Sequence, residues 1–443
     1  MKDNLINNEI LDVIGIGIGP FNLGLAALLQ PIPEIKYKFF DNKDAFVWHE
    51  GMLLEDTYLQ VPFMADLTTM VDPTNPYSYL NFLKENDRLY NFYFYENFKV
   101  PRLEYNRYCQ WVAHELSNLY FSHHVKDIHE DNGIFYVTVK DLKTNSNIVY
   151  KAKNLVLGVG TSPYAPSFIE PFLETKQCIH SSQYLFHKKM LQEKKSITVI
   201  GGGQSAAECF LDLLKDNNRF DYKLNWLTRS SGFLPMEYSK LGLEHFSPDY
   251  IEHFYHLSAD NRQKILASQG NWYKGISFST IKEIYDLLYL RSIDNGNKSL
   301  LQACSELVDI EDLGGFLDLS FKHTQVENQF TLKTDIVVFA TGYKYSIPNC
   351  FDSLRNKINF NADGYFNISR NYIVETKFDS NANIFIQNGE MHTHGITSSD
   401  LGLGPYRSSV IINTILGREY YKISKNIVFQ KFGINAEFDH VTI

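Results

Sequence analysis

The stretch Asp12-Val-Ile-Gly-Ile-Gly-Ile-Gly-Pro-Phe-Asn-Leu-Gly24 joins an apolar run to a glycine-rich turn. Residues 13–18 are typical of a buried parallel strand, and the apolar residues 23–29 predict a helix after the turn. Gly17 and Gly19 let the backbone approach a pyrophosphate, which the free N–H groups at the helix start would bind. We therefore predict a dinucleotide-binding unit, although Asn22 replaces the usual third glycine.

A carboxylate follows at the spacing that such a unit requires. Residues 37–40 form a second apolar strand and end in Asp41, about 20 residues beyond the turn. An acid at this point can accept hydrogen bonds from the hydroxyl groups of a ribose. The alternative is a tight turn within an α/β core that binds no nucleotide.

The chain repeats the device at Ser196-Ile-Thr-Val-Ile-Gly-Gly-Gly-Gln-Ser-Ala-Ala-Glu208. A predicted strand leads through Gly201 and Gly203 into a helix that we expect to reach residue 215. The next predicted strand, 222–228, ends in Arg229, where the first unit has Asp41. An arginine suits the 2′-phosphate of NADPH, so we expect NADPH rather than NADH. The alternative for Arg229 is a solvent-exposed loop cation.

Length and composition limit the possible classes. A chain of 443 residues suggests two or three domains, and its net charge of −9 argues against general nucleic-acid binding. No apolar run reaches the roughly 18 residues of a membrane span, and the polar N-terminus resembles no signal peptide. Five scattered cysteines without a Cys-x-x-Cys pair suit a reducing cytoplasm and disfavour a dithiol oxidoreductase. His392 and His394 alternate in a segment expected to be extended, but no third ligand is signalled, so we expect no metal.

Two dinucleotide units imply two nucleotides. Asp41 in the first and Arg229 in the second favour FAD in the first unit and NADPH in the second. Without a redox-active cysteine pair, O2 is the expected electron acceptor, through a flavin C4a-hydroperoxide and monooxygenation. Such a site must exclude water. Residues 45–52 predict a loop beside the nucleotide strand, where Trp48 and His49 could pack against a flavin or simply fill an aromatic core.

We therefore expect an α/β protein with two Rossmann-like dinucleotide-binding domains and a small helical substrate domain. The FAD domain would comprise residues 1–172 and 344–443, and the NADPH domain residues 173–236 and 298–343. A helical insertion, 237–297, would roof a substrate pocket. Further strands are predicted at 120–125, 135–139, 148–152, 155–161, 335–343 and 384–388. Further helices are predicted at 77–86, 102–119, 248–257, 261–269, 280–290 and 403–416.

Several stretches together resemble one enzyme family, the flavin-dependent N-hydroxylating monooxygenases of siderophore biosynthesis. These enzymes act on lysine, ornithine or diamines. The resemblance rests on Gly17-Ile-Gly-Pro-Phe-Asn22, Phe46-Val-Trp-His-Glu-Gly-Met52, Gly201-Gly-Gly-Gln-Ser-Ala-Ala-Glu208, Ala340-Thr-Gly-Tyr343 and Thr393-His-Gly395. It implies that FAD, NADPH and O2 hydroxylate a primary amine, in a dimer or tetramer. Of the signature of related Baeyer–Villiger enzymes, only His180-Ser181 and Tyr184 remain.

The resemblance also implies which residues form the site, with no side chain required as a nucleophile. The flavin environment would contain Trp48, His49 and Gln60. The implied FAD contacts are Gly17, Gly19, Pro20, Asn22, Asp41, Trp48, His49, Gln60, Val125, Gly342, His394 and Gly395. The implied NADPH contacts are Gly201, Gly203, Gln204, Ser205, Arg229 and Ser182. The implied substrate residues are Ala65, Leu243, Ser277 and Gly402.

The informative departures from the amino-acid hydroxylases lie at the substrate positions. Those enzymes have, at the position of Ala65, a lysine that pairs with the substrate carboxylate. Leu243 aligns with a polar residue near the substrate α-amino group, and Gly402 aligns with a serine. A carboxylate buried without its cation would cost several kcal/mol. We therefore expect a decarboxylated substrate such as putrescine or cadaverine.

Other substrates and another class of protein remain open from the sequence. Histamine is a further decarboxylated amine that such a site could accept. Lysine or ornithine would be the substrate if another group held the carboxylate. The alternative class is a flavoprotein that only oxidises NADPH or binds nucleotide without productive turnover.

Overall fold

A computed structural model describes residues 5–293, 299–378 and 380–434. Within them, seven strands form the first sheet, in the order β3-β2-β1-β6-β5-β4 with β17 also paired to β6. Their bounds are β1 (Leu5–Ile16), β2 (Tyr37–Phe40), β3 (Leu119–Tyr120), β4 (His123–Asp131), β5 (Ile134–Asp141), β6 (Asn147–Leu157) and β17 (Asn383–Ile386). Strands β3, β2, β1, β6 and β17 run parallel, as the first glycine-rich unit predicts.

Strand β6 pairs with two different strands, β5 and β17, along one of its edges. Its first half pairs antiparallel with β5, and residues 154–157 pair in parallel with β17. The prediction of separate strands at 148–152 and 155–161 is therefore wrong, because residues 153 and 154 continue β6, which ends at Leu157. The single strand predicted at 120–125 is also wrong. Ser122 adopts a left-handed conformation, with φ 56°, and separates β3 from β4.

Two helices cover one face of this sheet. Helix α1 (Pro20–Leu29) follows the glycine-rich turn, and α14 (Gly404–Leu416) packs along it. Helix α4 (Arg102–Glu115) also packs on α1, but it ends four residues before the predicted end at 119. Leu25, Tyr108 and Ile411 belong to the apolar core that these helices share.

The second sheet is fully parallel, in the order β11-β10-β9-β15-β8. Its strands are β8 (Cys178–His180), β9 (Ser196–Ile200), β10 (Lys223–Leu227), β11 (Ser299–Gln302) and β15 (Ile336–Phe339). Helix α7 (Gln204–Phe220) follows β9, as the second glycine-rich unit predicts. A three-stranded antiparallel sheet, β12 (Ser305–Asp312), β13 (Leu317–His323) and β14 (Gln329–Thr334), was not predicted.

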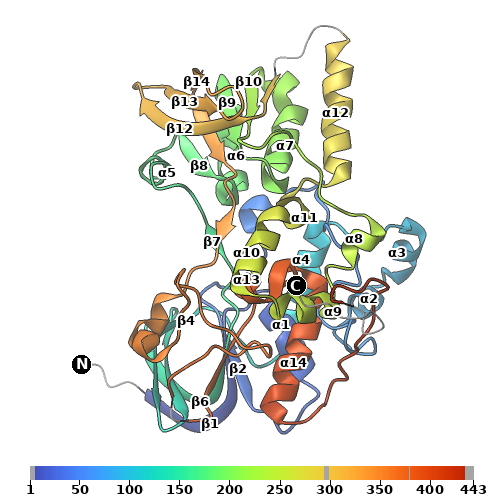
Figure 1. Cartoon of the computed structure of the whole chain (residues 1–443), viewed down its shortest axis with the longest axis vertical. Helices are drawn as coiled ribbons and strands as arrows, with labels where there is room; N and C mark the ends of the chain where they lie inside the picture. The colour runs from blue at the N-terminus through green and yellow to red at the C-terminus, as the bar shows by residue number, and fades with distance from the viewer. Residues whose placement is uncertain (1–4, 294–298, 379, 435–443) are drawn as a thin grey trace.

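The seven-stranded and five-stranded sheets lie toward opposite ends of the elongated molecule, as Figure 1 shows. The chain crosses between them at β7 (Ser162–Pro163) and returns at β16 (Tyr343–Lys344), and these two crossings pair antiparallel. The remaining helices are η1 (Glu50–Met52), α2 (Tyr79–Glu85), α3 (Leu89–Tyr95), α5 (Glu170–Leu173), η2 (Ser181–Gln183), α6 (Tyr184–Gln192), α8 (Lys240–Leu243), α9 (Pro248–Tyr255), α10 (Ala259–Ser268), α11 (Gly270–Lys274), α12 (Phe278–Ser292), η3 (Asn349–Lys357), α13 (Met391–His394), η4 (Gly395–Ser399) and η5 (Leu401–Leu403).

The helices of the segment 237–297 pack on two different parts of the molecule. Helices α9 and α10 lie against α13 and η4, where Phe254 packs on Ile396. Helix α12 instead packs on α7, and Ile284 joins the core of the second sheet. The domain bounds given above stay a prediction. None of the helices in the described part of the chain combines the length and apolar character needed to span a membrane.

Candidate active site

The first glycine-rich turn leaves an open cradle at the start of α1. Gly17 has φ +84°, and a Cβ there would lie 2.7 Å from the Gly158 carbonyl oxygen, so only glycine fits. Gly19 precedes α1 without any side-chain cap. Pro20 occupies the first helical position, where a missing N–H costs nothing. The next N–H groups of the helix have no intrahelical acceptor, so they can bind an anion.

The side chain of Asn22 holds this turn in place by hydrogen bonds. Its side chain is fully buried, and its Nδ2 donates to the Gly17 carbonyl oxygen at 2.8 Å. Its Oδ1 accepts from Gln387 Nε2 at 2.8 Å, just beyond β17. The contact of Asn22 with FAD stays a prediction, and the side chain itself bonds within the protein. The amide replaces the third glycine because it ties the turn to the ends of neighbouring strands.

Asp41 lies at the carboxyl end of β2, beside the turn. Its Oδ2 accepts from the Ile18 N–H at 2.7 Å, and its Oδ1 accepts from the Lys43 N–H at 2.9 Å. These backbone bonds fix the carboxylate at the edge where the turn opens. This is the position from which an acid can bind a ribose.

Trp48 and His49 lie on a loop that reaches toward the second crossing. The Trp48 N–H donates to Asn106 Oδ1 at 2.8 Å, and its ring meets Tyr105 edge-on at 5.1 Å. His49 takes a left-handed conformation, with φ 52°, and its exposed ring lies 6.0 Å from that of Tyr343 on β16. The loop therefore borders the junction of the two sheets, and Trp48 is half-buried against α4.

The second glycine-rich turn has the same form. Gly201 has φ +150°, and a Cβ there would meet the Ala340 carbonyl oxygen at 2.4 Å. Gly203 precedes α7 without a side-chain cap, and Ser205 lies in the first helical turn. Arg229 follows β10 with an exposed side chain, which leaves its guanidinium free to reach an anion at this turn.

The side-chain amide of Gln204 forms its hydrogen bonds with other residues of the protein. Its Oε1 accepts from the Ser277 N–H at 2.7 Å, and its Nε2 donates to Glu208 at 3.0 Å and to Thr280 at 3.1 Å. The amide thus fastens α7 to the start of α12. Only the backbone N–H of Gln204 is left for a ligand. Ser277 caps α12, so the structure joins this predicted substrate residue to the predicted NADPH turn.

A cleft of about 520 Å³ opens between the loop 53–60 and helices α7 and α12. Gln60, Gln204 and Ser277 line it, so one predicted residue of each kind (flavin, NADPH and substrate) meets the same space. Gln60 Nε2 is buried and has no hydrogen-bond partner among the described residues. A buried donor without an acceptor is costly, which marks Gln60 as a group prepared for a ligand.

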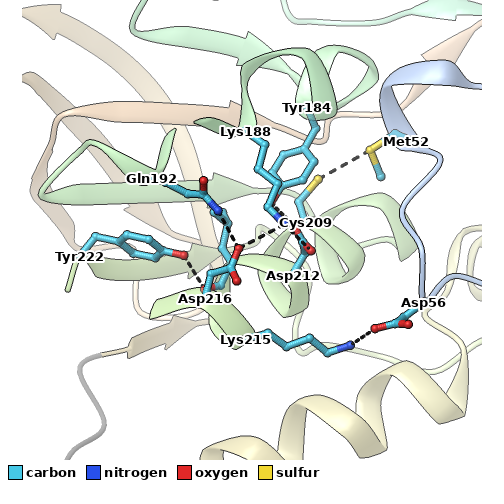
Figure 2. Close-up of polar contacts among 11 residues, drawn as sticks. Met52, Asp56, Tyr184, Lys188, Gln192, Cys209, Asp212, Lys215, Asp216 and Tyr222 are labelled. Atoms are coloured by element: carbon cyan, nitrogen blue, oxygen red, sulfur yellow. Dashed lines mark hydrogen bonds and ion pairs between the residues drawn. The ribbon is translucent and has the colours of Figure 1, made fainter. Parts of the chain in front are cut away.

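Ion pairs and a sulfur contact hold the wall of this cleft to α7 (Figure 2). Lys215 Nζ lies 2.9 Å from Asp56 on the loop, and Lys188 Nζ on α6 lies 2.8 Å from Asp212 on α7. Met52 Sδ lies 3.7 Å from Cys209 Sγ. Further along the wall, Arg102 and the buried Glu208 pair at 2.7 Å. The loop is therefore fixed against the second sheet's main helix.

Two predicted FAD contacts lie inside the core. Val125 is only 7% exposed, in the core of the first sheet. His394 is fully buried, and its ring stacks on Tyr372 at 4.3 Å. Burial lowers the pKa of His394 to about 3, so the imidazole is neutral. The side chains of both residues are thus engaged within the protein, and their contact with FAD stays a prediction.

The histidine segment also differs in conformation from its prediction. Residues 391–394 form α13 rather than an extended strand. His392 Nε2 lies 2.8 Å from the Phe366 carbonyl oxygen, so this ring is also engaged with the protein. Gly395 ends the helix with φ +78° against Phe254.

Gly342 and Ser182, at the junction of the sheets, both form hydrogen bonds with the ring of His180. Gly342 has φ +94°, open space at its Cβ position, and a carbonyl oxygen 3.1 Å from His180 Nε2. The other ring nitrogen of His180 lies 3.0 Å from Ser182 Oγ. Gly342 therefore keeps an open face, while the hydroxyl of Ser182 is already bound.

Two predicted substrate residues meet in space. A Cβ at Gly402 would lie 3.5 Å from Ala65 Cβ and 3.0 Å from Asp400 Oδ1. Leu243 lies on α8, after Tyr238. Asp400 and Tyr238 are not among the residues predicted from the sequence. A lone acid after Ser399 carries no motif, so only the position of Asp400 beside Gly402 reveals it.

Comparison with known proteins identifies the family. The model of the L-lysine 6-monooxygenase/L-ornithine 5-monooxygenase family matches residues 9–345. The chain belongs to this family. It is 45% identical to a putrescine N-hydroxylase from Shewanella oneidensis, over 96% of this chain and 85% of that protein. The resemblance noted from the motifs is thereby confirmed.

Solved structures of this family share the fold. The FAD-bound cadaverine monooxygenase of the desferrioxamine pathway from Erwinia amylovora is 43% identical, with a TM-score of 0.94 over 97% of this chain and 100% of that one. An ornithine N-hydroxylase from Kutzneria sp. 744, with reduced FAD, NADP+ and L-ornithine, is 26% identical, with a TM-score of 0.86 over 92% and 99%. The predicted α/β fold with two dinucleotide-binding units is confirmed.

Proposed function

We propose that this monooxygenase N-hydroxylates a primary diamine, such as putrescine or cadaverine, for hydroxamate siderophore biosynthesis. The observation that carries the proposal is the meeting of Ala65 with Gly402 beside a carboxylate. In the amino-acid hydroxylases that the chain resembles, the position of Ala65 holds a lysine for the substrate carboxylate. Here the same place offers an anion and no cation. The putrescine and cadaverine enzymes among its relatives support this substrate class.

FAD and NADPH are the cofactors, and the residues fit them. Gly17, Gly19 and the first N–H groups of α1 would hold the FAD pyrophosphate, with Asp41 at the ribose. The orphaned Nε2 of Gln60 would donate to the flavin side of the cleft. The turn at Gly203 would hold NADPH, with Arg229 at its phosphate. When bound, FAD reduced by NADPH supplies the activation of O2.

The protein itself positions the substrate, excludes water and sets the protonation state of the reacting amine. The reacting amine must be neutral to act as a nucleophile, although a free alkylamine has a pKa of about 10.4. Burial of the substrate in the site would disfavour the charged form, because burial penalises an ammonium group. The ion pair between Lys215 and Asp56 holds the loop 53–60 against α7 and so helps to keep water from the reacting atoms.

A substrate panel tests the proposal. Hydroxylamine formed and NADPH consumed would be measured with putrescine, cadaverine, histamine, ornithine and lysine at equal concentration. We expect the two diamines to give the highest kcat/KM, with hydroxylamine closely matching NADPH. Lysine or ornithine as the best substrate would refute the interpretation of Ala65. NADPH consumption without any hydroxylamine would instead indicate an oxidase.

Compartment and assembly complete the proposal. All five cysteines are buried free thiols, which suits the reducing cytoplasm where we place the enzyme. A dimer or tetramer stays a prediction, and analytical ultracentrifugation of the FAD-loaded protein would test it.

A further inference from the structure

Asp400 lies where the two altered substrate positions meet. It directly precedes η5, and a Cβ at Gly402 would stand 3.0 Å from its Oδ1. The same Cβ would stand 3.5 Å from Ala65 Cβ. The carboxylate therefore adjoins Gly402, and Gly402 in turn adjoins Ala65, the two places from which the amino-acid-binding side chains are missing.

This carboxylate has no cation of its own. Among the described residues, no lysine, arginine or histidine forms an ion pair with Asp400. It is half-buried. Burial raises the pKa of Asp400 to about 6, while the N–H groups of Gly402 and Leu403 oppose this rise. A partly desolvated carboxylate without a countercharge is unfavourable, so a cation that pairs with Asp400 would stabilise the site.

The surroundings connect Asp400 with the cleft. The pKa of the Tyr238 phenol is raised, mainly by burial and secondly by the negative charge of Asp400. Lys99 lines the cleft and places its Nζ 4.2 Å from the centre of the Tyr238 ring. The ammonium group of Lys99 therefore contacts the Tyr238 ring, and it forms no ion pair with Asp400 among the described residues. Asp400 remains available to a cation that enters from solvent.

We propose that Asp400 binds the distal ammonium group of the diamine and selects diamines over amino acids and monoamines. The inference rests on the proposed function and names the group that determines its specificity. A charge-assisted hydrogen bond would hold the far end of the substrate and so direct the near amine to the reacting centre. Lysine or ornithine would bring an α-carboxylate to the same anion, and this repulsion rejects them.

The experiment compares a diamine with a monoamine of the same length. Wild type and Asp400→Asn, both loaded with FAD, would be assayed for hydroxylamine with putrescine and with n-butylamine. We expect Asp400→Asn to raise KM for putrescine about 10- to 100-fold, the range of a lost hydrogen bond to a charged group. The KM for n-butylamine should change less than about twofold, since it has no second ammonium.

A matched control and a second variant make the result decisive. Asp318 on β13 is another half-buried carboxylate with an oxygen that lacks a partner, and Asp318→Asn should leave the ratio of putrescine to n-butylamine unchanged. Asp400→Glu extends the carboxylate by one methylene, so it should shift preference from cadaverine toward putrescine. This second variant decides the question if Asp400→Asn does not fold.

The outcomes separate the two proposals. If wild type hydroxylates diamines but Asp400→Asn keeps the full preference for putrescine over n-butylamine, Asp400 does not bind the ammonium. An unchanged ratio of cadaverine to putrescine in Asp400→Glu would overturn the inference equally. If wild type hydroxylates no diamine, the proposed function itself fails.

Discussion

Substitution of Ala65 by lysine should place a permanent cation in the space that we assign to the substrate ammonium. Ala65 is only 6% exposed, and its Cβ lies beside Gly402 and hence beside Asp400. Two unit charges 4 Å apart attract by about 4 kcal/mol at an effective dielectric constant of 20. The net value of one hydrogen bond to a charged group is smaller, about 1.5–3 kcal/mol.

The new lysine would satisfy Asp400 from within the protein, so the diamine would lose this interaction. A loss of 1.5–3 kcal/mol corresponds to a fall of about 10- to 150-fold in kcat/KM for putrescine. A long side chain also crowds a buried position, at a cost of about 1–3 kcal/mol. Ala65→Met separates the two effects, because its stem is similar in length and carries no charge.

The assay is hydroxylamine formation with putrescine, cadaverine, lysine and ornithine, together with FAD content and Tm of each variant. We expect Ala65→Lys to lose clearly more diamine activity than Ala65→Met and to gain at most slight activity with the amino acids. Equal losses in the two variants would show that the effect is steric, and the electrostatic reasoning would then be wrong.

Four further predictions follow from the site and the core. Arg229→Ala should raise KM for NADPH and leave KM for NADH nearly unchanged. An equal rise of KM for both cofactors would refute the assignment of Arg229 to the 2′-phosphate. Asn22→Gly, although it restores the usual glycine, should lower Tm, since the loss of buried hydrogen bonds costs about 1–3 kcal/mol. Below about pH 6 protonation of Asp400 should raise KM for putrescine but not for n-butylamine, as steady-state kinetics from pH 5 to 8 would show. Arg407→Met should destabilise the fold by about 3–5 kcal/mol in denaturant titrations, because it leaves the buried Glu390 unpaired; adding Glu390→Gln should restore most of this.

The local parts of the fold were predictable, because their signals lie within a few residues. Both glycine-rich turns lead into helices as predicted, and β2 has the predicted bounds. The sheet β12–β14 escaped prediction because charged residues interrupt the apolar pattern of its strands, as in Ser305–Asp312. The continuity of β6 was missed because its pairing changes from β5 to β17 along its length.

The site was predictable only where one residue carries its own chemistry. Gly17 and Gly201 reveal themselves by sequence because their backbones admit no other residue. The role of Asn22 depends on Gln387, and the importance of Asp400 depends on Gly402 and Ala65. Such relations between distant residues have no local signature, so only the folded chain shows them.

The bond between Gln387 and Asn22 has a consequence for how the enzyme is made. It joins residues 365 positions apart, and β17, which ends just before Gln387, is the last strand to enter the first sheet. A nascent chain can form β1 and α1 early, but the support beneath their turn is absent until almost the whole polypeptide has left the ribosome. Contacts of such long sequence separation slow folding. Flavin capture is therefore a late event in biosynthesis, and a truncated chain that ends before residue 383 should be released without it.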